Sequence, residues 1–120
     1  MIYILIPTFE RFDLTIKCIE SIYKQTYNNF HIIVIDDQSK DLRYKTLKSF
    51  KSLTLLSTKG NKFWGGTMNV GLNFIKNILS DEDYLLMLNN DTFIPKDYLS
   101  KLFSLMELDK KIVIGSVTKN

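Results

Sequence analysis

The chain has 120 residues, of which 45% are hydrophobic and 24% are charged, and its formal net charge is +3 at pH 7. This composition is typical of one soluble globular domain and excludes a disordered chain, a collagen-like chain and a coiled coil. The weak positive charge suits a phosphorylated ligand but does not indicate a nucleic-acid partner.

Apolar runs and amphipathic segments alternate in the first half of the chain. Residues 2–6 form an apolar run closed by Pro7, and residues 30–35 are rich in β-branched side chains, so both predict buried strands. Between them, Asp13 is expected to cap a helix that extends to about residue 25. A short helix over residues 41–50 and a third strand over residues 53–57 are expected next.

The second half continues the alternation. Residues 58–65 are expected to form a loop, followed by a helix over residues 66–79 that Gly71 weakens by about 1 kcal/mol relative to alanine. Residues 84–88 predict a fourth strand. Pro95 suits the first turn of a helix that extends to about residue 108, and residues 112–114 predict a fifth strand.

This order of elements predicts one α/β domain over residues 1–120. Near-continuous apolar strands separated by helices indicate a mostly parallel sheet with helices on both faces. Such sheets bind ligands at the carboxyl ends of their strands. Polar residues do collect after the first four predicted strands, within residues 7–11, 36–39, 61–69 and 89–92.

Three acids on this edge allow both a structural and a functional interpretation. Asp36 and Asp37 either form a turn and cap the next helix, or accept hydrogen bonds from a ligand such as a pyrimidine or a ribose. Asp91 either completes a turn or holds Mg²⁺ or Mn²⁺. These cations prefer oxygen ligands and are often held by one or two carboxylates together with substrate phosphates.

The segment around residues 61–69 is also open to two interpretations. Gly65 and Gly66 either form a flexible turn or let a ligand approach the backbone, with Gly66 opening a helix whose free N–H groups would bind an anion. Trp64 either stacks on a ligand ring or covers the core, and the core is the favoured interpretation.

Other nucleotide-binding and regulatory classes are disfavoured by motif. Residues 60–67 almost fit a P-loop, but Gly66 stands where a P-loop has its lysine. No Gly-x-Gly-x-x-Gly follows a strand, so a dinucleotide fingerprint is absent from the sequence. A phosphoryl-receiver domain places its acids after the first and third strands, whereas here they follow the second and fourth.

The expected location is the cytoplasm. Cys18 is the single cysteine, so neither an intrachain disulfide nor a zinc cluster is expected. The N-terminus lacks the features of a signal peptide, and no apolar run approaches the roughly 18 residues of a membrane span.

Four segments, taken in order, resemble family 2 glycosyltransferases of the GT-A fold. They are residues 4–11 (ILIPTFER), 34–39 (VIDDQS), 61–71 and 88–92 (LNNDT), and the resemblance covers the whole chain. Residues 64–71 (WGGTMNVG) with Asn89-Asn90-Asp91 are most similar to the rhamnosyltransferase-like branch. The resemblance implies a Rossmann-like nucleotide-diphospho-sugar transferase fold, truncated to its N-terminal donor-binding portion.

The resemblance also implies a set of donor-binding residues. These are Pro7, Thr8, Phe9, Arg11, Asp36, Asp37, Gly65, Gly66, Asn69 and Asn90. The first four would line the base and ribose, and the two aspartates would accept hydrogen bonds from a pyrimidine. The glycines and Asn69 would lie close to the diphosphate or the sugar.

A Mg²⁺ or Mn²⁺ cofactor is implied in the same way. Asp91 matches the last acid of the family's Asp-x-Asp metal motif, whereas Asn89 replaces the first. Because one carboxylate is left, metal affinity in the absence of nucleotide is expected to be poor.

The implied activity is transfer of a sugar from a UDP- or dTDP-linked donor to a glycan, lipid-linked or other hydroxyl acceptor, with inversion, in cell-surface polysaccharide synthesis. The general base of an inverting reaction lies in the family's acceptor-binding half, and Glu107 and Asp109 are poor candidates for it. The alternative is a non-catalytic nucleotide-sugar-binding fragment. No nucleic-acid partner is expected, whereas peripheral membrane association and self-association through an unpaired sheet edge are.

Overall fold

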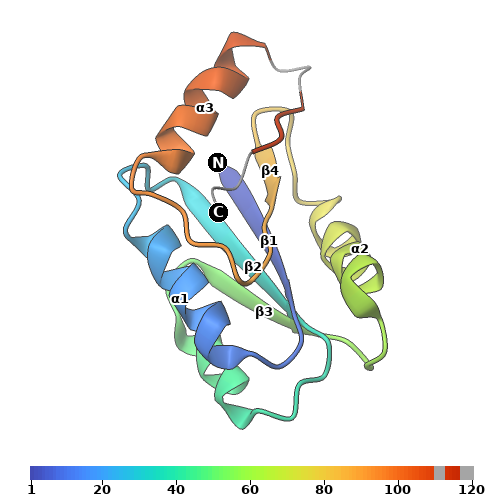
Figure 1. Cartoon of the computed structure of the whole chain (residues 1–120). Helices are drawn as coiled ribbons and strands as arrows, with labels where there is room; N and C mark the ends of the chain where they lie inside the picture. Colours follow the sequence, from blue (N-terminus) through green and yellow to red (C-terminus); the bar gives the residue numbers. More distant parts are fainter. Residues whose placement is uncertain (110–112, 117–120) are drawn as a thin grey trace.

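The computed structural model describes residues 1–109 and 113–116, and its strands form a single parallel sheet. The strands are β1 (Ile2–Thr8), β2 (Phe30–Asp36), β3 (Leu53–Ser57) and β4 (Tyr84–Met87). Their order in the sheet is β3-β2-β1-β4, and every pair of neighbours is parallel (Figure 1). The mostly parallel α/β sheet predicted from the sequence is therefore confirmed.

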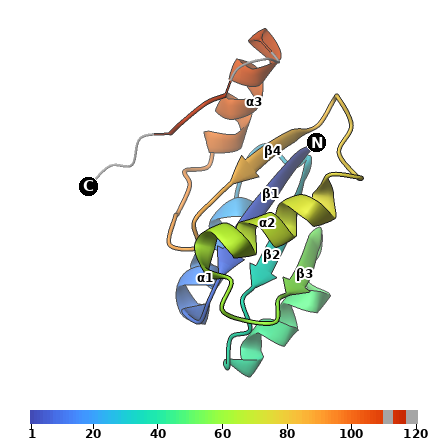
Figure 2. The same ribbon diagram turned by 90° about the vertical axis from the view of Figure 1, so that its right-hand side faces the viewer.

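Helices cover both faces of the sheet, as predicted. They are α1 (Phe12–Tyr23), the 3₁₀ helix η1 (Leu42–Ser49), α2 (Phe63–Ile75) and α3 (Tyr98–Leu108). Figure 2 shows α2 on one face and α1 on the other. The larger core cluster joins the sheet to α1, η1 and α3, and the smaller joins it to α2. Within the described residues, no helix combines the length and the apolarity that crossing a bilayer requires.

β1 continues two residues beyond its predicted end, through Pro7 to Thr8. The carbonyl of Leu5 accepts a hydrogen bond of 2.9 Å from Leu88 on the β4 side, and that of Thr8 accepts one of 2.8 Å from Asp37 on the β2 side. Alternate residues of β1 therefore face opposite neighbours. Pro7 faces the β4 side, beyond the last paired residue of β4, so its missing N–H costs no sheet hydrogen bond.

Two helix starts differ from the prediction, and a distant side chain contacts one of them, that of α3. α1 begins after Arg11, which has left-handed backbone angles, so the prediction that Asp13 caps this helix is wrong. α3 begins at Tyr98 instead of Pro95. The buried amide of Gln25 accepts a hydrogen bond of 3.0 Å from the N–H of Leu99 and donates one of 2.7 Å to the carbonyl of Pro95.

α2 also differs, since it starts at Phe63 rather than at residue 66 and ends at Ile75. Gly71 lies where this helix packs closely on the sheet. A Cβ at Gly71 would lie 2.8 Å from the Ile35 side chain and 3.0 Å from that of Leu5. The glycine that weakens the helix by propensity is therefore the residue that lets it pack.

The remaining predicted elements differ in smaller ways. The predicted helix over residues 41–50 is the 3₁₀ helix η1, capped by the Asp41 side chain, which accepts a hydrogen bond from the N–H of Arg43. Of the predicted fifth strand, Ile112 lies outside the described residues, and Val113 and Ile114 form no strand.

Candidate functional site

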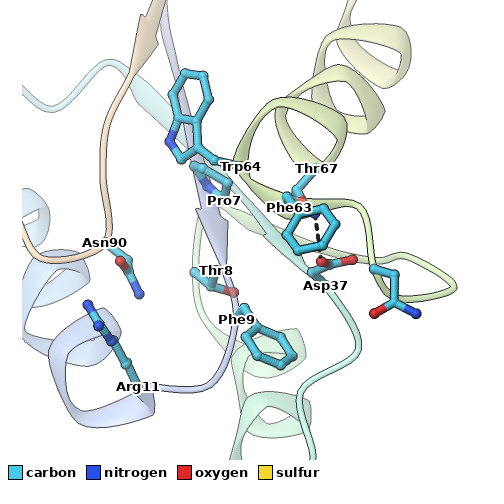
Figure 3. A pocket seen from close by; sticks show the side chains of 10 residues that line it. Pro7, Thr8, Phe9, Arg11, Asp37, Phe63, Trp64, Thr67 and Asn90 are labelled. Carbon is cyan, nitrogen blue, oxygen red and sulfur yellow. Dashed lines mark hydrogen bonds between the residues drawn. The ribbon is translucent and has the colours of Figure 1, made fainter.

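A pocket of about 380 Å³ opens at the carboxyl edge of the sheet, where the fold predicts a ligand. Its walls come from the ends of β1, β2 and β4 and from the start of α2 (Figure 3). The lining residues are Pro7, Thr8, Phe9, Arg11, Asp37, Asn61, Phe63, Trp64, Thr67 and Asn90.

Six of the predicted donor-binding residues meet in this pocket. They are Pro7, Thr8, Phe9, Arg11, Asp37 and Asn90. The side chains of Arg11 and Asn90 point toward each other on one side, and Phe9 lies on another (Figure 3). Arg11 is the one cation among the lining residues, which suits an anionic ligand.

Five other predicted site residues do not line the pocket: Asp36, Gly65, Gly66, Asn69 and Asp91. The buried carboxylate of Asp36 accepts hydrogen bonds from the backbone N–H of Ser39 at 3.1 Å and from its hydroxyl at 2.5 Å. Asp36 therefore forms the turn that the structural interpretation expects. Burial raises the pKa of its carboxyl group above the ordinary value.

The two glycines of α2 have different surroundings. The N–H of Gly66 is bonded to the Lys62 carbonyl at 3.1 Å, and the Lys62 side chain lies where a Cβ of Gly66 would point. The expectation that Gly66 opens the helix with a free N–H is therefore wrong. Gly65 lies on an exposed turn, and a Cβ at this position would meet no atom within 4 Å, so protein packing does not require a glycine there.

Asp37 supplies the anion at the start of α2. This residue is 5% exposed, and its carboxylate accepts hydrogen bonds from the N–H groups of Lys62, at 3.0 Å, and Phe63, at 3.1 Å. The Thr58 hydroxyl donates to the same carboxylate. The sequence suggests that the N-terminus of this helix is free to bind an anionic ligand. Instead, the side chain of Asp37, the residue that follows β2, caps it.

Three exposed aromatic rings line the pocket. Phe9 is 61% exposed, Phe63 79% and Trp64 55%. The prediction that Trp64 covers the core is wrong, because its ring lines the pocket and its indole N–H bonds the Asn89 side chain. Exposed apolar rings around a cavity are typical of a binding site for a ligand with a planar or apolar face.

Hydrogen bonds fix the remaining polar wall. The Asn90 amide donates a hydrogen bond of 3.1 Å to the Thr15 hydroxyl, which is 2.9 Å from the Tyr44 hydroxyl. The Thr67 hydroxyl is buried on the α2 side and is the one buried side-chain polar atom, among the described residues, without a hydrogen-bond partner. Such an atom at a pocket wall is a candidate partner for a ligand or a water.

Sequence reasoning missed four lining residues: Trp64, which it assigned to the core, and Asn61, Phe63 and Thr67, which it did not single out. The local pattern predicts a loop over residues 58–65, which hides the first turn of α2. With the helix placed from Phe63, Thr67 falls one turn later on the same face, at i+4. The helical period would have identified Thr67 if the start of α2 had been known. That start depends on Asp37, which lies 26 residues before Phe63.

The carboxylates and the cysteine near the pocket limit the chemistry available. The described residues contain no group of three His, Cys, Asp or Glu side chains that could hold a metal ion. Asp91 is exposed and stands alone next to the pocket loop. Burial, with a smaller contribution from Asp91, raises the pKa of Cys18 to about 12, so this thiol is not a nucleophile at neutral pH.

Comparisons with known proteins place the chain among transferases. The family model described as "Glycosyl transferase family 2" matches residues 3–120. The glycosyltransferase GlyA of Streptococcus pneumoniae is 27% identical over 96% of this chain and 16% of its own length. The amylovoran biosynthesis glycosyltransferase AmsB of Erwinia amylovora is 31% identical over 94% of this chain and 40% of its own length. The chain thus spans less than half of either relative.

Solved structures share the fold. The complex of Staphylococcus aureus TarS, residues 1–349, with UDP-GlcNAc has a TM-score of 0.77 at 20% identity, over 91% of this chain and 32% of that one. The mannosyltransferase PcManGT of Pyrobaculum calidifontis, in complex with GDP-Man and Mn²⁺, has a TM-score of 0.74 at 18% identity, over 88% and 32%. At these identities the likeness extends to the fold alone.

Proposed function

The chain belongs to glycosyl transferase family 2, and from this premise we propose that it binds the donor in a sugar transfer from a UDP- or dTDP-linked sugar to a glycan or another hydroxyl acceptor. We place the reaction in cell-surface polysaccharide synthesis, with inversion at the sugar. The relation to AmsB, named for amylovoran biosynthesis, supports this placement. The WGGTMNVG segment at residues 64–71 supports the rhamnosyltransferase-like branch of the family.

The observation that carries the proposal is the convergence on one pocket of six donor residues that the family resemblance implies. Its volume, about 380 Å³, lies within the range of about 300–1,000 Å³ typical of small-molecule sites. Exposed rings offer stacking faces for a base, and the Arg11 guanidinium offers hydrogen-bond donors and a positive charge that suit an anionic nucleotide. Neither would serve a purely structural cavity.

We assign the base and ribose to the wall formed by Pro7, Thr8, Phe9 and Arg11. The diphosphate and sugar would extend toward the loop of Asn90 and the exposed turn of α2. The open space at Gly65 supports a close approach there, and Asn69 is exposed one turn further along. Gly66 and Asp36 enter this assignment only as supports of the loops.

We propose that Mg²⁺ or Mn²⁺ binds with the donor at Asp91. One exposed carboxylate fits a cation whose other ligands are diphosphate oxygens and water, and it does not fit a preformed protein cage. The Mn²⁺ in the PcManGT complex supports this assignment. When bound, the cation would offset the negative charge of the departing diphosphate.

The second candidate function is nucleotide-sugar binding without transfer. One observation favours it. Asp37 is the one carboxylate among the lining residues, and it already accepts hydrogen bonds from backbone N–H groups at the start of α2. Glu107 accepts a hydrogen bond from Tyr84 on the far end of α3, away from the pocket. Transfer would therefore need a general base from outside the lining residues.

The expected acceptor is lipid-linked or a glycan, and we propose a cytoplasmic location with peripheral membrane association to reach it. We also propose self-association through the open edge of β4, where the side chains of Leu85 and Met87 are exposed. Solution scattering at rising protein concentration tests the latter, and a monodisperse monomer throughout would contradict it.

Calorimetric titration of UDP and of dTDP, each with and without Mn²⁺, tests the donor site. We expect binding that strengthens with Mn²⁺ in the unaltered chain and loses that metal dependence in Asp91→Ala. Asp81→Ala, which removes an exposed acid on another loop, is the matched control and should bind like the unaltered chain. A folded chain that binds neither nucleotide would contradict the proposal.

A further inference from the structure

The side chains of η1 repeat with a period of three. A 3₁₀ helix has three residues per turn, so side chains three positions apart lie in one row along it. One row packs into the core: Tyr44, Leu47 and, at the end of the helix, Phe50. Another row is exposed: Leu42, Lys45 and Lys48. Figure 1 shows η1 in blue-green below α1, so this exposed row belongs to the side of the sheet opposite α2.

The exposed row carries positive charge that no acid opposes. Residues 42–80 contain seven basic residues and no acidic one, although the whole chain has sixteen basic and thirteen acidic residues. Among the described residues, Lys45, Lys48 and the exposed Lys51 of the next turn form no ion pair. Two acids, one in the first turn of α1 and one before η1, pair instead with Arg43, at 3.0 Å and 2.7 Å. Unopposed lysines at one surface are typical of a surface that meets an anionic partner.

Apolar side chains beside these lysines favour a lipid surface over a nucleic acid. Leu42 is 72% exposed, and Tyr23 at the end of α1 is 38% exposed. The Tyr23 hydroxyl donates a hydrogen bond of 2.6 Å to the carbonyl of Lys51, so the end of α1 lies against the turn that follows η1. Exposed leucine and tyrosine side chains insert at the headgroup level of a bilayer, where the aliphatic stems of lysines also contact lipid. A nucleic-acid partner would require a more basic domain than a net charge of +3 provides.

η1 is also joined to the loop that carries two pocket residues, Phe9 and Arg11. Glu10 lies between them, and its N–H donates a hydrogen bond of 2.6 Å to the Ser39 hydroxyl. The carbonyl of Glu10 accepts a hydrogen bond from the Tyr44 hydroxyl of η1. Contact of η1 with a lipid surface would therefore hold this wall of the pocket in place relative to that surface, as transfer to a lipid-linked acceptor requires.

We propose that Leu42, Lys45, Lys48 and Lys51, the η1 row, form the surface by which the chain binds anionic lipid headgroups. This inference rests on the proposed peripheral membrane association and uses none of the donor-binding residues. The three lysines attract the headgroups, and Leu42 inserts among them.

Co-sedimentation with vesicles of phosphatidylglycerol and phosphatidylcholine in equal parts tests the lysines. The triple variant Lys45→Gln, Lys48→Gln, Lys51→Gln should lose vesicle binding by about five-fold for each lysine replaced, the usual effect of one basic residue near an anionic membrane. Replacement of the same three lysines by arginine keeps the charge and should retain binding.

The matched control removes the same charge from other elements. It is the triple variant of three exposed lysines outside η1: Lys76→Gln, Lys96→Gln and Lys101→Gln. This control should bind the vesicles almost as well as the unaltered chain. The η1 variant should keep the unaltered UDP affinity and urea unfolding, because its three side chains are exposed and lie outside the pocket.

Salt separates the contribution of Leu42 from that of the lysines. Binding of the unaltered chain should fall as salt rises, because salt screens the attraction between exposed lysines and headgroups. Leu42→Gln should weaken binding while leaving its dependence on salt unchanged, since it removes apolar contact and no charge. Equal binding by Leu42→Gln and the unaltered chain would overturn the insertion of this side chain.

The outcomes separate this inference from the function on which it rests. If the unaltered chain does not bind the anionic vesicles, peripheral membrane association and the η1 surface are both wrong, whereas the UDP titration still tests the donor site. If the chain binds vesicles and the two glutamine variants lose binding equally, membrane association stands and the η1 row is overturned. An η1 variant that loses binding to single-stranded DNA but not to vesicles would assign the row to a nucleic acid and overturn the proposal.

Discussion

The indole N–H of Trp64 donates a hydrogen bond of 2.8 Å to the side-chain oxygen of Asn89. This contact joins the first turn of α2 to the loop that follows β4, across 25 positions of sequence. The resemblance places Asn89 where the family's metal motif has its first acid. In this chain the side-chain oxygen at that position accepts a hydrogen bond from an aromatic neighbour.

Asn89→Leu should release the Trp64 ring while Asn89→Asp should retain it, because aspartate keeps an acceptor oxygen. The chain has one tryptophan, so its fluorescence reports on this ring alone. We expect a red-shifted emission in the leucine variant, with a stability loss of about 0.5–1.5 kcal/mol, the usual net worth of one hydrogen bond. Identical emission spectra for the two variants would contradict the contact.

Gly71→Ala should destabilise the chain. The new methyl group would meet Ile35 at 2.8 Å and Leu5 at 3.0 Å, and overpacking of this kind costs about 1–3 kcal/mol. This exceeds the helix-propensity gain of about 1 kcal/mol. Urea unfolding measures the net change.

Gly65→Ala is the matched control within the same helix. Its methyl group meets nothing within 4 Å, so the propensity gain should appear as increased stability. If Gly71→Ala and Gly65→Ala changed the free energy of unfolding equally, the close contact at Gly71 would not be the cause of its destabilisation. A drop in UDP affinity for Gly65→Ala, despite higher stability, would support the proposed diphosphate position.

The sheet and its faces could be predicted from the sequence, whereas the helix starts could not. Apolar runs such as residues 30–35 identify buried strands by composition alone. The start of α2 depends on Asp37, and the start of α3 depends on Gln25, which lies 74 positions before the N–H it accepts. Local patterns carry no information about such long-range caps.

Asp36→Asn should change how stability depends on pH. Burial raises the pKa of this carboxyl group in the folded chain above its ordinary 3.8, with smaller contributions from Glu10 and Asp37, while hydrogen bonds from Ser39 act in the opposite direction. Protonated Asp36 therefore contributes full stability below about pH 3.8, and this contribution is lost as pH rises through the folded pKa. Relative to the asparagine variant, the unaltered chain should lose stability as pH rises from about 3.8 toward neutrality.

Asp41→Asn provides a control of opposite sign. Hydrogen bonds from Arg43 lower the pKa of Asp41, so its stabilising contribution is present above the unfolded pKa and lost as pH falls. Urea titrations of both variants over the same pH range should therefore give slopes of opposite sign. Slopes of the same sign would contradict the environment assigned to Asp36.

Gln25→Leu should cost about 1–3 kcal/mol, because the Leu99 N–H and the Pro95 carbonyl lose a buried partner. Thr26→Val removes an exposed hydrogen bond from the neighbouring side chain to Lys96, so it should change stability by less than about 0.5 kcal/mol. Thermal unfolding compares the two. Because Gln25 also anchors the segment after Asn90, its loss should weaken UDP binding as well.

The site is predicted best where the sequence motif and the strand ends coincide. Pro7 and Thr8 end β1 and Phe9 follows it directly, so their place at the edge follows from the strand itself. Phe63 lies in a segment whose conformation is imposed by Asp37, and its φ of 57° is not suggested by a phenylalanine. Strained positions escape sequence reasoning because they violate the local preferences on which that reasoning depends.

The pocket takes its walls from the ends of β1, β2 and β4 and from the start of α2, so it exists only when strands from across the chain are already paired. A nucleotide held there would bind the native chain and leave the unfolded chain untouched. At a free concentration of one hundred times its dissociation constant it would add about 2.7 kcal/mol to the free energy of unfolding. Thermal-shift screening of nucleotides would therefore identify the donor without any acceptor, and a cognate nucleotide supplied during expression would act as a chemical chaperone for the domain.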